Sequence, residues 1–119
     1  MHEFSLARAC LAAVEEAARA EGARRVRAIR LRVGILRAVV PDALRFAFEV
    51  LGRGTAAEGA AIEIELVPAR GSCRACGGTF SLREFAIECP GCGALALDLD
   101  GGDLLQVDSI DVDDETEGP

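Results

Sequence analysis

Two cysteine pairs in the second half of the chain constrain its fold more than any other feature. They read Cys73-Arg74-Ala75-Cys76-Gly77 and Cys89-Pro90-Gly91-Cys92-Gly93, and twelve residues separate Cys76 from Cys89. Two thiolates three positions apart grip one ion only where the backbone turns sharply, which the glycines after each pair permit. Two such knuckles predict a closed tetrahedral four-sulfur site, which suits structural Zn(II).

Iron and redox chemistry are the alternatives to zinc on the same residues. Rubredoxin-like electron carriers also hold iron with paired Cys-x-x-Cys motifs, but they usually shield the iron with aromatic residues. This chain has five Phe and neither Trp nor Tyr. A redox dithiol would leave one of the two pairs unexplained. The fifth cysteine, Cys10, lies on the apolar stripe of a predicted helix and is expected to be a buried, inert thiol.

Cysteine use and hydropathy also bear on the compartment. Nothing at the N-terminus looks like a secretion signal, and five cysteines without one favour metal binding or thiol chemistry over disulfides. No apolar run approaches the roughly 20 residues that cross a bilayer. We therefore expect a cytoplasmic protein that has no membrane partner.

Charge is distributed unevenly along the chain. The formal net charge is −7, from 20 acidic residues and 13 arginines. Six acids and no base lie between Asp108 and Pro119, and without them the body of the protein is close to neutral. Residues 113–119 are therefore expected to form a disordered acidic tail.

Hydrophobic periodicity predicts an α/β (α+β) fold. Apolar residues at helical spacing predict helices over residues 5–20 and 42–52, and alternation predicts strands over 25–35, 61–67 and 105–112. We expect a small three-stranded sheet with two helices on one face. The apolar residues expected to line that face are Ile29, Leu31, Val33, Ile62, Ile64, Leu66, Leu105 and Val107.

The cysteine pairs interrupt this pattern before the last strand. Between them, Thr79–Glu88 is consistent with a short strand or hairpin, and Gly101-Gly102 marks a turn. The expected domains are an α/β domain over residues 1–69 and 96–112 and an inserted zinc lobe with two Cys-x-x-Cys knuckles over residues 70–95.

The first residues of the chain include its single histidine, His2. The Met1 α-amine, the His2 backbone nitrogen and the His2 imidazole Nδ1 can chelate one ion through linked five- and six-membered rings. Deprotonated amide nitrogens favour square-planar Ni(II) or Cu(II) over tetrahedral zinc. Amides at the start of a helix have no intrahelical partner, so they are available for this role. By itself, however, a histidine at position 2 carries little weight.

Several segments match the pattern of a known family. They are Met1-His2-Glu3-Phe4-Ser5-Leu6, Leu31-Arg32-Val33-Gly34, Pro41–Glu49, Ile62-Glu63-Ile64, Val67-Pro68, both cysteine pairs and Gly102-Asp103-Leu104-Leu105. From Met1 to about Val112 the chain resembles the HypA/HybF family, the nickel metallochaperones of NiFe-hydrogenase maturation. An opening Met-His-Glu joined to this cysteine arrangement at this length is highly specific.

The resemblance implies two metals with different roles. In such proteins the N-terminal segment, here Met1, His2 and Glu3, binds transferable Ni(II), and the four paired cysteines bind structural Zn(II). The implied partners are an accessory GTPase, the NiFe-hydrogenase large subunit and, for members that serve urease, urease accessory proteins. With a single histidine in the chain, the fourth nickel donor is left to the Met1 amine, the Glu3 amide, water or a partner's group.

An enzyme and a nucleic-acid-binding module are the two other classes of function to which the sequence is compared. No Ser/His/Asp set, paired acid and base or glycine-rich phosphate loop argues for an enzyme. A zinc-ribbon nucleic-acid or transcription accessory module is the alternative, because six arginines lie between Arg24 and Arg37. The net charge of −7 and the scarcity of aromatic residues weaken it, and we expect no nucleic-acid partner.

Overall fold

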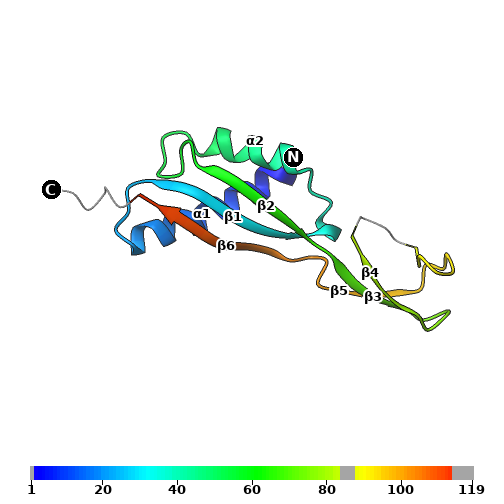
Figure 1. The fold of residues 1–119 in the computed structure, drawn as a ribbon. Coiled ribbons are helices and arrows are strands. Elements are labelled where there is room, and N and C mark those ends of the chain that lie inside the picture. Colours follow the sequence, from blue (N-terminus) through cyan, green and yellow to red (C-terminus); the bar gives the residue numbers. More distant parts are fainter. Residues whose placement is uncertain (1, 84–87, 114–119) are drawn as a thin grey trace. The chain divides into compact units, whose positions relative to one another are not determined.

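A computed structural model describes residues 2–83 and 88–113 (Figure 1). In chain order the elements are α1 (His2–Ala20), β1 (Val26–Gly34), the 3-10 helix η1 (Ile35–Arg37), α2 (Pro41–Leu51), β2 (Ala61–Val67), β3 (Ala69–Cys73), β4 (Thr79–Leu82), β5 (Leu97–Asp100) and β6 (Leu105–Val112). Met1, residues 84–87 of the expected hairpin and residues 114–119 of the expected tail lie outside the described residues.

The chain divides into two compact units. Unit 1 comprises Met1–Leu31, Val39–Ile64 and Gln106–Pro119, and unit 2 comprises Arg32–Ala38 and Glu65–Leu105. One three-stranded sheet has the order β2-β1-β6, and a second has the order β4-β3-β5. The mixed α/β class and the first sheet were predicted from the sequence, whereas the second sheet was not.

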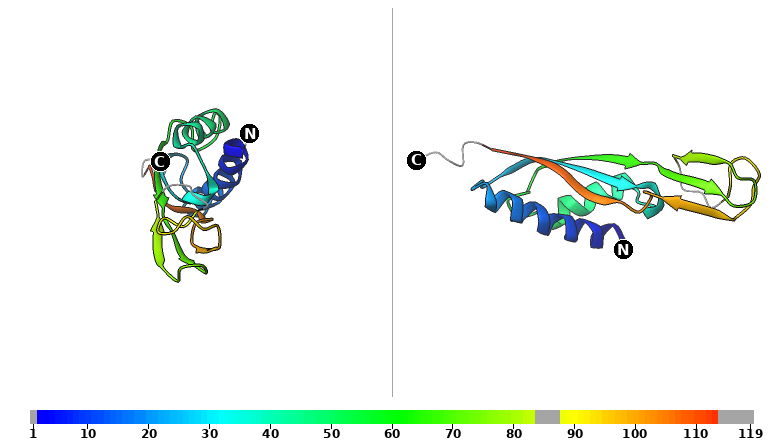
Figure 2. Two further views of the ribbon diagram at one scale, coloured as in Figure 1. Left: turned by 90° about the vertical axis from the view of Figure 1, so that its right-hand side faces the viewer. Right: turned by 90° about the horizontal axis from the view of Figure 1, so that it is seen from below.

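Within unit 1, helices α1 and α2 pack against each other and cover one face of the first sheet (Figure 2). The buried residues of α1 recur at helical spacing and are Ala7, Cys10, Leu11, Val14 and Ala18. Helix α1 stops just before Gly22, whose φ of 70° lies in the left-handed region that suits glycine. In the described part of the chain, neither α-helix is long and apolar enough to cross a membrane.

Helix α2 begins and ends close to its predicted limits. Pro41 opens the helix, where a missing N–H group costs nothing. The Gly52 N–H donates to the Phe48 carbonyl at 2.8 Å and closes the last turn. Leu44, Ala47 and Phe48 are buried, so the predicted apolar stripe of α2 is the side that faces the core.

The predicted inward alternation holds in β1 and fails at one position of β2. Ile29, Leu31 and Val33 are at most 1% exposed. The two isoleucines of β2 are half-buried, but Leu66 is 45% exposed, so the expectation that it lies inward is wrong. Leu66 belongs to unit 2, whose described residues include no α-helix that would cover it.

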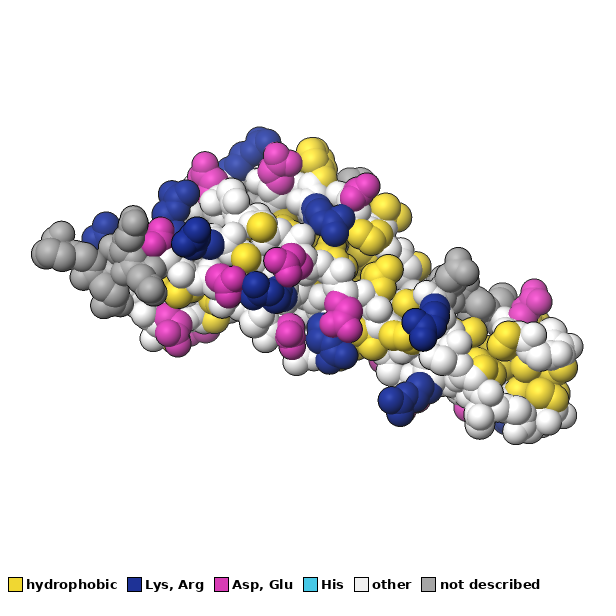
Figure 3. Space-filling model, in the orientation of Figure 1, with side chains coloured by type: hydrophobic (Ala, Val, Ile, Leu, Met, Phe, Trp, Pro, Cys, Tyr) yellow, Lys and Arg dark blue, Asp and Glu magenta, His cyan; other side chains and the backbone are white. Residues whose placement is uncertain are grey.

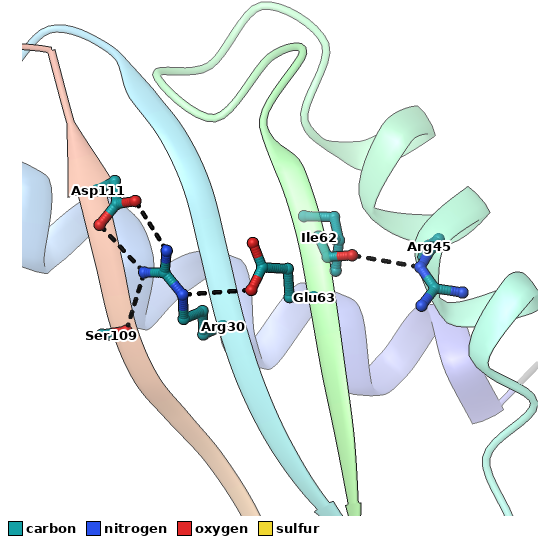
Figure 4. A network of polar contacts seen from close by, with 6 residues as sticks. All are labelled: Arg30, Arg45, Ile62, Glu63, Ser109 and Asp111. Carbon is teal, nitrogen blue, oxygen red and sulfur yellow. Dashed lines mark hydrogen bonds and ion pairs between the residues drawn. The ribbon is translucent and has the colours of Figure 1, made fainter.

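The outward side chains of the first sheet form an ion-pair network in unit 1 (Figure 4). Arg30 donates two hydrogen bonds to the Asp111 carboxylate, each at 3.0 Å, and its Nε lies 3.2 Å from a Glu63 oxygen. The pairing with Asp111 raises the pKa of Arg30 and lowers the pKa of Asp111. All three side chains are partly exposed, so each pair adds little stability.

The second sheet forms the body of unit 2, with β3 between two antiparallel neighbours. Gly71 of β3 lies opposite Phe80 of β4 and Leu99 of β5. A Cβ atom at position 71 would meet the Phe80 ring at 2.6 Å and Leu99 at 2.7 Å. Glycine therefore lets two apolar side chains close over the middle strand. The buried residues of this cluster are Ile35, Ala69 and Leu82.

Two more glycines allow a close approach within unit 2, where η1 meets the turn before β6. The Gly34 N–H donates to the Leu104 carbonyl at 2.7 Å, and the Leu36 N–H donates to the Gly102 carbonyl at 2.8 Å. A Cβ atom at Gly34 would lie 2.2 Å from the Gly102 carbonyl oxygen. No larger residue fits at position 34 unless the backbone moves.

Candidate metal centres

The four cysteines of the two pairs lie together in unit 2. Their Sγ atoms are all within 4.8 Å of one another, with 3.7 Å between Cys73 and Cys92 and 3.8 Å between Cys76 and Cys89. Sulfurs at the corners of a tetrahedron around zinc, with bonds of about 2.3 Å, are about 3.8 Å apart. The donor set therefore fits a structural metal such as zinc. No other His, Cys, Asp or Glu among the described residues joins this cluster.

The same backbone turn shapes both cysteine pairs. The Gly77 N–H donates to the Cys73 carbonyl at 2.8 Å, and the Gly93 N–H donates to the Cys89 carbonyl at 2.9 Å. The φ angles of these glycines are 77° and 80°, a region that residues with a Cβ atom enter only at a cost. The glycines after each pair thus make the sharp turn that was predicted from the sequence.

Backbone amides and neighbouring thiols set the electrostatics of the second pair. The Gly91 N–H lies 3.4 Å from the Cys89 sulfur. The amides of Cys92 and Gly91 lower the pKa of Cys89 to about 7. The amide of Ala94 lowers the pKa of Cys92, but the surrounding thiols and burial outweigh it and raise that pKa to about 11. Cys89 is therefore the sulfur of this pair that ionises more readily.

The two cysteines of each pair differ in exposure. Cys73 and Cys89 are 2% and 4% exposed, whereas Cys76 and Cys92 are exposed. Each knuckle thus has one buried and one exposed cysteine. Four sulfurs on one ion leave no open coordination position. Cys10 is buried in helix α1, as predicted, and belongs to unit 1.

The other predicted site, at the N-terminus, belongs to unit 1. Helix α1 begins at His2, so the first backbone N–H groups of the chain have no intrahelical acceptor. Nδ1 of His2 lies 3.6 Å from Oε2 of Glu3, and the His2 side chain is 49% exposed. The imidazole nitrogen of the expected chelate is therefore open to solvent and beside a carboxylate. Met1, the third expected residue, lies outside the described residues.

Glu3 connects this terminus to the start of α2. Its Oε2 accepts a hydrogen bond from the Val40 N–H at 3.1 Å, and Val40 immediately precedes α2. This bond, followed by the backbone of Glu3 itself and the nearby His2, lowers the pKa of Glu3. The contact was not predicted from the sequence, because Glu3 and Val40 are 37 positions apart.

Two aromatic side chains, one from α1 and one from α2, pack together in unit 1. The rings of Phe4 and Phe46 pack edge to face, with centroids 6.2 Å apart and an interplanar angle of 85°. Phe46 is 54% exposed and Val40 is 57% exposed. The contact between Phe4 and Phe46 was not predicted from the sequence. The signal for it was Phe46, an aromatic residue that lies off the buried stripe of α2.

The arginines of β1 do not form a continuous basic stripe. On the face drawn in Figure 3, basic and acidic side chains are interspersed. Arg30 is shared between Asp111 and Glu63, and Arg32 lies 3.3 Å from a carboxylate oxygen of Glu65. Because phosphate contacts need available guanidinium donors, these pairs argue against a nucleic-acid surface on the strand.

Together these features define a class of small mixed α/β proteins with two helices on a three-stranded sheet and a four-cysteine centre suited to structural zinc. Comparison with known proteins specifies the family. The family model described as "Hydrogenase/urease nickel incorporation, metallochaperone, hypA" matches residues 1–112. The chain belongs to the HypA family.

Individual relatives agree with this assignment. The hydrogenase maturation factors HypA of Geobacter metallireducens and Methylocella silvestris are each 42% identical over 113 residues, which cover 95% of this chain and 100% of each relative. The solution structure of the Ni metallochaperone HypA from Helicobacter pylori matches with a TM-score of 0.64 at 20% identity, covering 94% of this chain and 97% of that one. This structural match supports the fold, and the predicted family resemblance is confirmed.

Proposed function

We propose that this protein binds Ni(II) at its N-terminus and delivers it to the large subunit of a NiFe-hydrogenase during maturation. Membership of a nickel-incorporation family supports the process. The main support for the site is the start of α1 at His2. The first backbone nitrogens of the helix have no intrahelical partner there, and the His2 imidazole is half-exposed. A site with few donors at an exposed end suits an ion that must later be released.

The proposed nickel donors are the Met1 amine, the His2 backbone nitrogen and the His2 Nδ1. Strong-field nitrogen donors of this kind favour a square-planar ion. The chain itself supplies no second imidazole, because His2 is its single histidine. The fourth position is left to the Glu3 amide, water or a group of the receiving protein. A ligand from the partner that enters this position would begin the transfer before the ion leaves its first site.

The proposed role of the second metal is structural. The four clustered cysteines hold Zn(II) in a domain assigned to residues 70–95, and residues 1–69 and 96–112 form the nickel-binding domain. The small buried cluster of unit 2 supports this role, because a bound ion adds folding free energy where apolar burial is limited. Zinc therefore stays with the protein while nickel is passed on.

The proposed role also defines partners and a compartment. The partners are the NiFe-hydrogenase large subunit, an accessory GTPase and, if urease is also served, urease accessory proteins. Passing an ion between two sets of ligands breaks no covalent bond of a substrate, so the function is binding and transfer rather than catalysis. We place the protein in the cytoplasm, where its five free cysteines stay reduced.

A maturation assay tests delivery. In cells that lack this protein, the wild-type chain should restore the nickel content of the isolated hydrogenase large subunit, and His2→Ala should not. Ser5→Ala is the matched control, because Ser5 is exposed on the same helix and provides no proposed donor. Nickel is counted by mass spectrometry of the purified subunit. Equal restoration by His2→Ala and the wild type would contradict delivery from the N-terminus.

A further inference from the structure

The four-cysteine centre of unit 2 combines thiolate chemistry with uneven exposure. Cys76 and Cys92 are exposed, whereas Cys73 and Cys89 are buried. A metal ion deprotonates the thiols that bind it, so all four sulfurs are thiolates when the site is loaded. Peroxides oxidise those thiolates that solvent can reach. The two exposed cysteines are therefore the candidates for chemical modification.

The backbone turns beside the exposed cysteines leave open space. Gly77 follows Cys76, and Gly93 follows Cys92. A Cβ atom on either glycine would meet no described heavy atom within 4 Å, apart from those of its neighbours in the chain. The space beside each turn therefore has room for a molecule as small as hydrogen peroxide.

Each exposed cysteine lies against a buried cysteine of the other knuckle. The Cys92 Sγ lies 3.7 Å from the Cys73 Sγ, and the Cys76 Sγ lies 3.8 Å from the Cys89 Sγ. An accessible thiolate beside a resolving cysteine is the arrangement found in redox-sensitive thiols. The centre contains this arrangement twice, and each pair of sulfurs joins one knuckle to the other.

We propose that this centre is a peroxide-sensitive modification site, in which Cys76 and Cys92 react and the buried cysteines resolve them. The Cys92 thiolate attacks a peroxide oxygen, so that an S–O bond forms, the O–O bond breaks and hydroxide leaves. The Cys73 thiolate then attacks the sulfur of this sulfenic acid, so that an S–S bond forms, the S–O bond breaks and a second hydroxide leaves. Two thiolates have lost two electrons, and one peroxide has gained them. Cys76 and Cys89 react in the same way with a second peroxide.

This oxidation removes the ligands of the metal. A thiolate binds zinc through its negative charge, and a sulfur in a disulfide no longer has that charge, so the ion leaves. Both disulfides cross from one knuckle to the other and replace the link that the ion provided. Unit 2 therefore keeps its fold without zinc, and a thiol reductant regenerates the site by exchange. The inference rests on the structural zinc proposed above.

Peroxide titration of the zinc-loaded full chain tests the inference. Two equivalents of hydrogen peroxide should release all of the bound zinc to a chromogenic chelator. Peptide mapping by mass spectrometry should then find one disulfide between Cys73 and Cys92 and another between Cys76 and Cys89. With less peroxide, dimedone, which traps sulfenic acids, should label Cys76 and Cys92 and neither buried cysteine of the centre. A thiol reductant with added zinc should restore the original zinc content.

A control variant and a second spectrum make the test specific. Cys10→Ala should release the same amount of zinc, because this buried thiol lies in unit 1. After oxidation, the amide signals of Gly71 and Leu82 should persist in nuclear magnetic resonance spectra. A chelator that removes zinc from the reduced protein should instead abolish them, because no disulfide then links the knuckles.

The possible outcomes separate the switch from the metal. Disulfides within a knuckle, between Cys73 and Cys76 or between Cys89 and Cys92, would overturn the proposal. Retention of zinc in a large excess of peroxide, or dimedone on the buried cysteines alone, would also overturn it. A chain that forms both predicted disulfides but is isolated without zinc would contradict the proposed metal and not the pairing of the thiols.

Discussion

Unit 1 buries side chains from helices α1 and α2 and from strand β1, whereas the apolar cluster of unit 2 buries Ile35, Ala69 and Leu82. The candidate metal sites of the two units also differ, in a way that follows the size of each core. The unit with the larger core has its site at an exposed helix start, beside His2. The unit with the smaller core has its site between two knuckles, with Cys73 and Cys89 buried. On the proposed function, unit 1 folds on its own core and can give up an ion, while unit 2 depends on its ion and retains it.

The donors reinforce this contrast. Four thiolates complete the coordination shell of a tetrahedral ion and leave no position for a partner's ligand. The proposed nickel donors, a terminal amine, one amide and one imidazole, leave a fourth position open, and protons compete for these nitrogens. On the proposed function, the retention of zinc and the release of nickel follow from the number of donors and from where each unit holds its site.

The largest expected effect is loss of the four-cysteine centre. Cys73→Ala should lose zinc and disorder residues 70–95, because structural zinc contributes an apparent binding free energy of about 10–16 kcal/mol at pH 7. Zinc content by mass spectrometry and amide spectra would report it, and the signals of Val14 and Ile29 in unit 1 should persist. Cys10→Ala, the control, should keep its zinc. Retention of one zinc after replacement of all four paired cysteines would contradict the assignment.

The next effect concerns the close glycine contact of unit 2. Gly34→Ala should lower the free energy of unfolding by more than about 3 kcal/mol, because its Cβ would lie 2.2 Å from a backbone oxygen that cannot move freely. Gly91→Ala is the control, since its Cβ would meet nothing closer than the Cys89 sulfur at 3.8 Å. Urea unfolding of the zinc-loaded proteins measures both. Similar losses in the two variants would show that the contact is not as tight as described.

A smaller effect is expected in unit 1 at Glu3. Glu3→Gln should lower the free energy of unfolding by about 1 kcal/mol near pH 7, because a charged acceptor for the Val40 N–H becomes neutral. The pKa of Glu3 is lowered in the folded protein, so its contribution is present above the usual pKa of glutamate. It is lost as pH falls through the lowered value, and the difference between variants should shrink between about pH 6 and about pH 2.

Urea unfolding across that pH range provides the measurement, with Glu16→Gln as control. Glu16 is also on α1, but its side chain is 77% exposed and pairs with Arg19 alone among the described residues. A difference for Glu3→Gln that stays constant with pH would show that the carboxylate charge does not stabilise the start of α2.

Much of the fold could be predicted because its elements are locally determined. Helices α1 and α2 and strands β1, β2 and β6 each have an apolar period that matches their structure, with Gly22 and Pro41 near the expected ends. The turns of the cysteine pairs could also be predicted, because each knuckle is a local turn closed by its own glycine. Leu66 shows the limit of periodicity, since alternation does not reveal whether another element covers a strand.

The features that the sequence did not predict depend on distant partners. Strand β3 contains Arg70, Gly71 and Ser72, which have no apolar alternation, and it is extended because β4 and β5 pair with its two edges. The hydrogen bond between Glu3 and Val40 likewise joins residues far apart in the chain. In both cases the determining interaction is between segments whose proximity exists only after folding.

The most direct test of the central claim is a nickel titration of the untagged protein with zinc measured in the same samples. The wild type should bind nickel as a diamagnetic ion with a weak visible band, and His2→Ala should lose this binding while keeping zinc and fold. Blocking the N-terminal amine should weaken binding although His2 remains, and acidification should release the ion. Deletion of residues 113–119 should change nothing. If His2→Ala titrates like the wild type and the deletion abolishes binding, nickel sits on the acidic segment and the proposed N-terminal site is wrong.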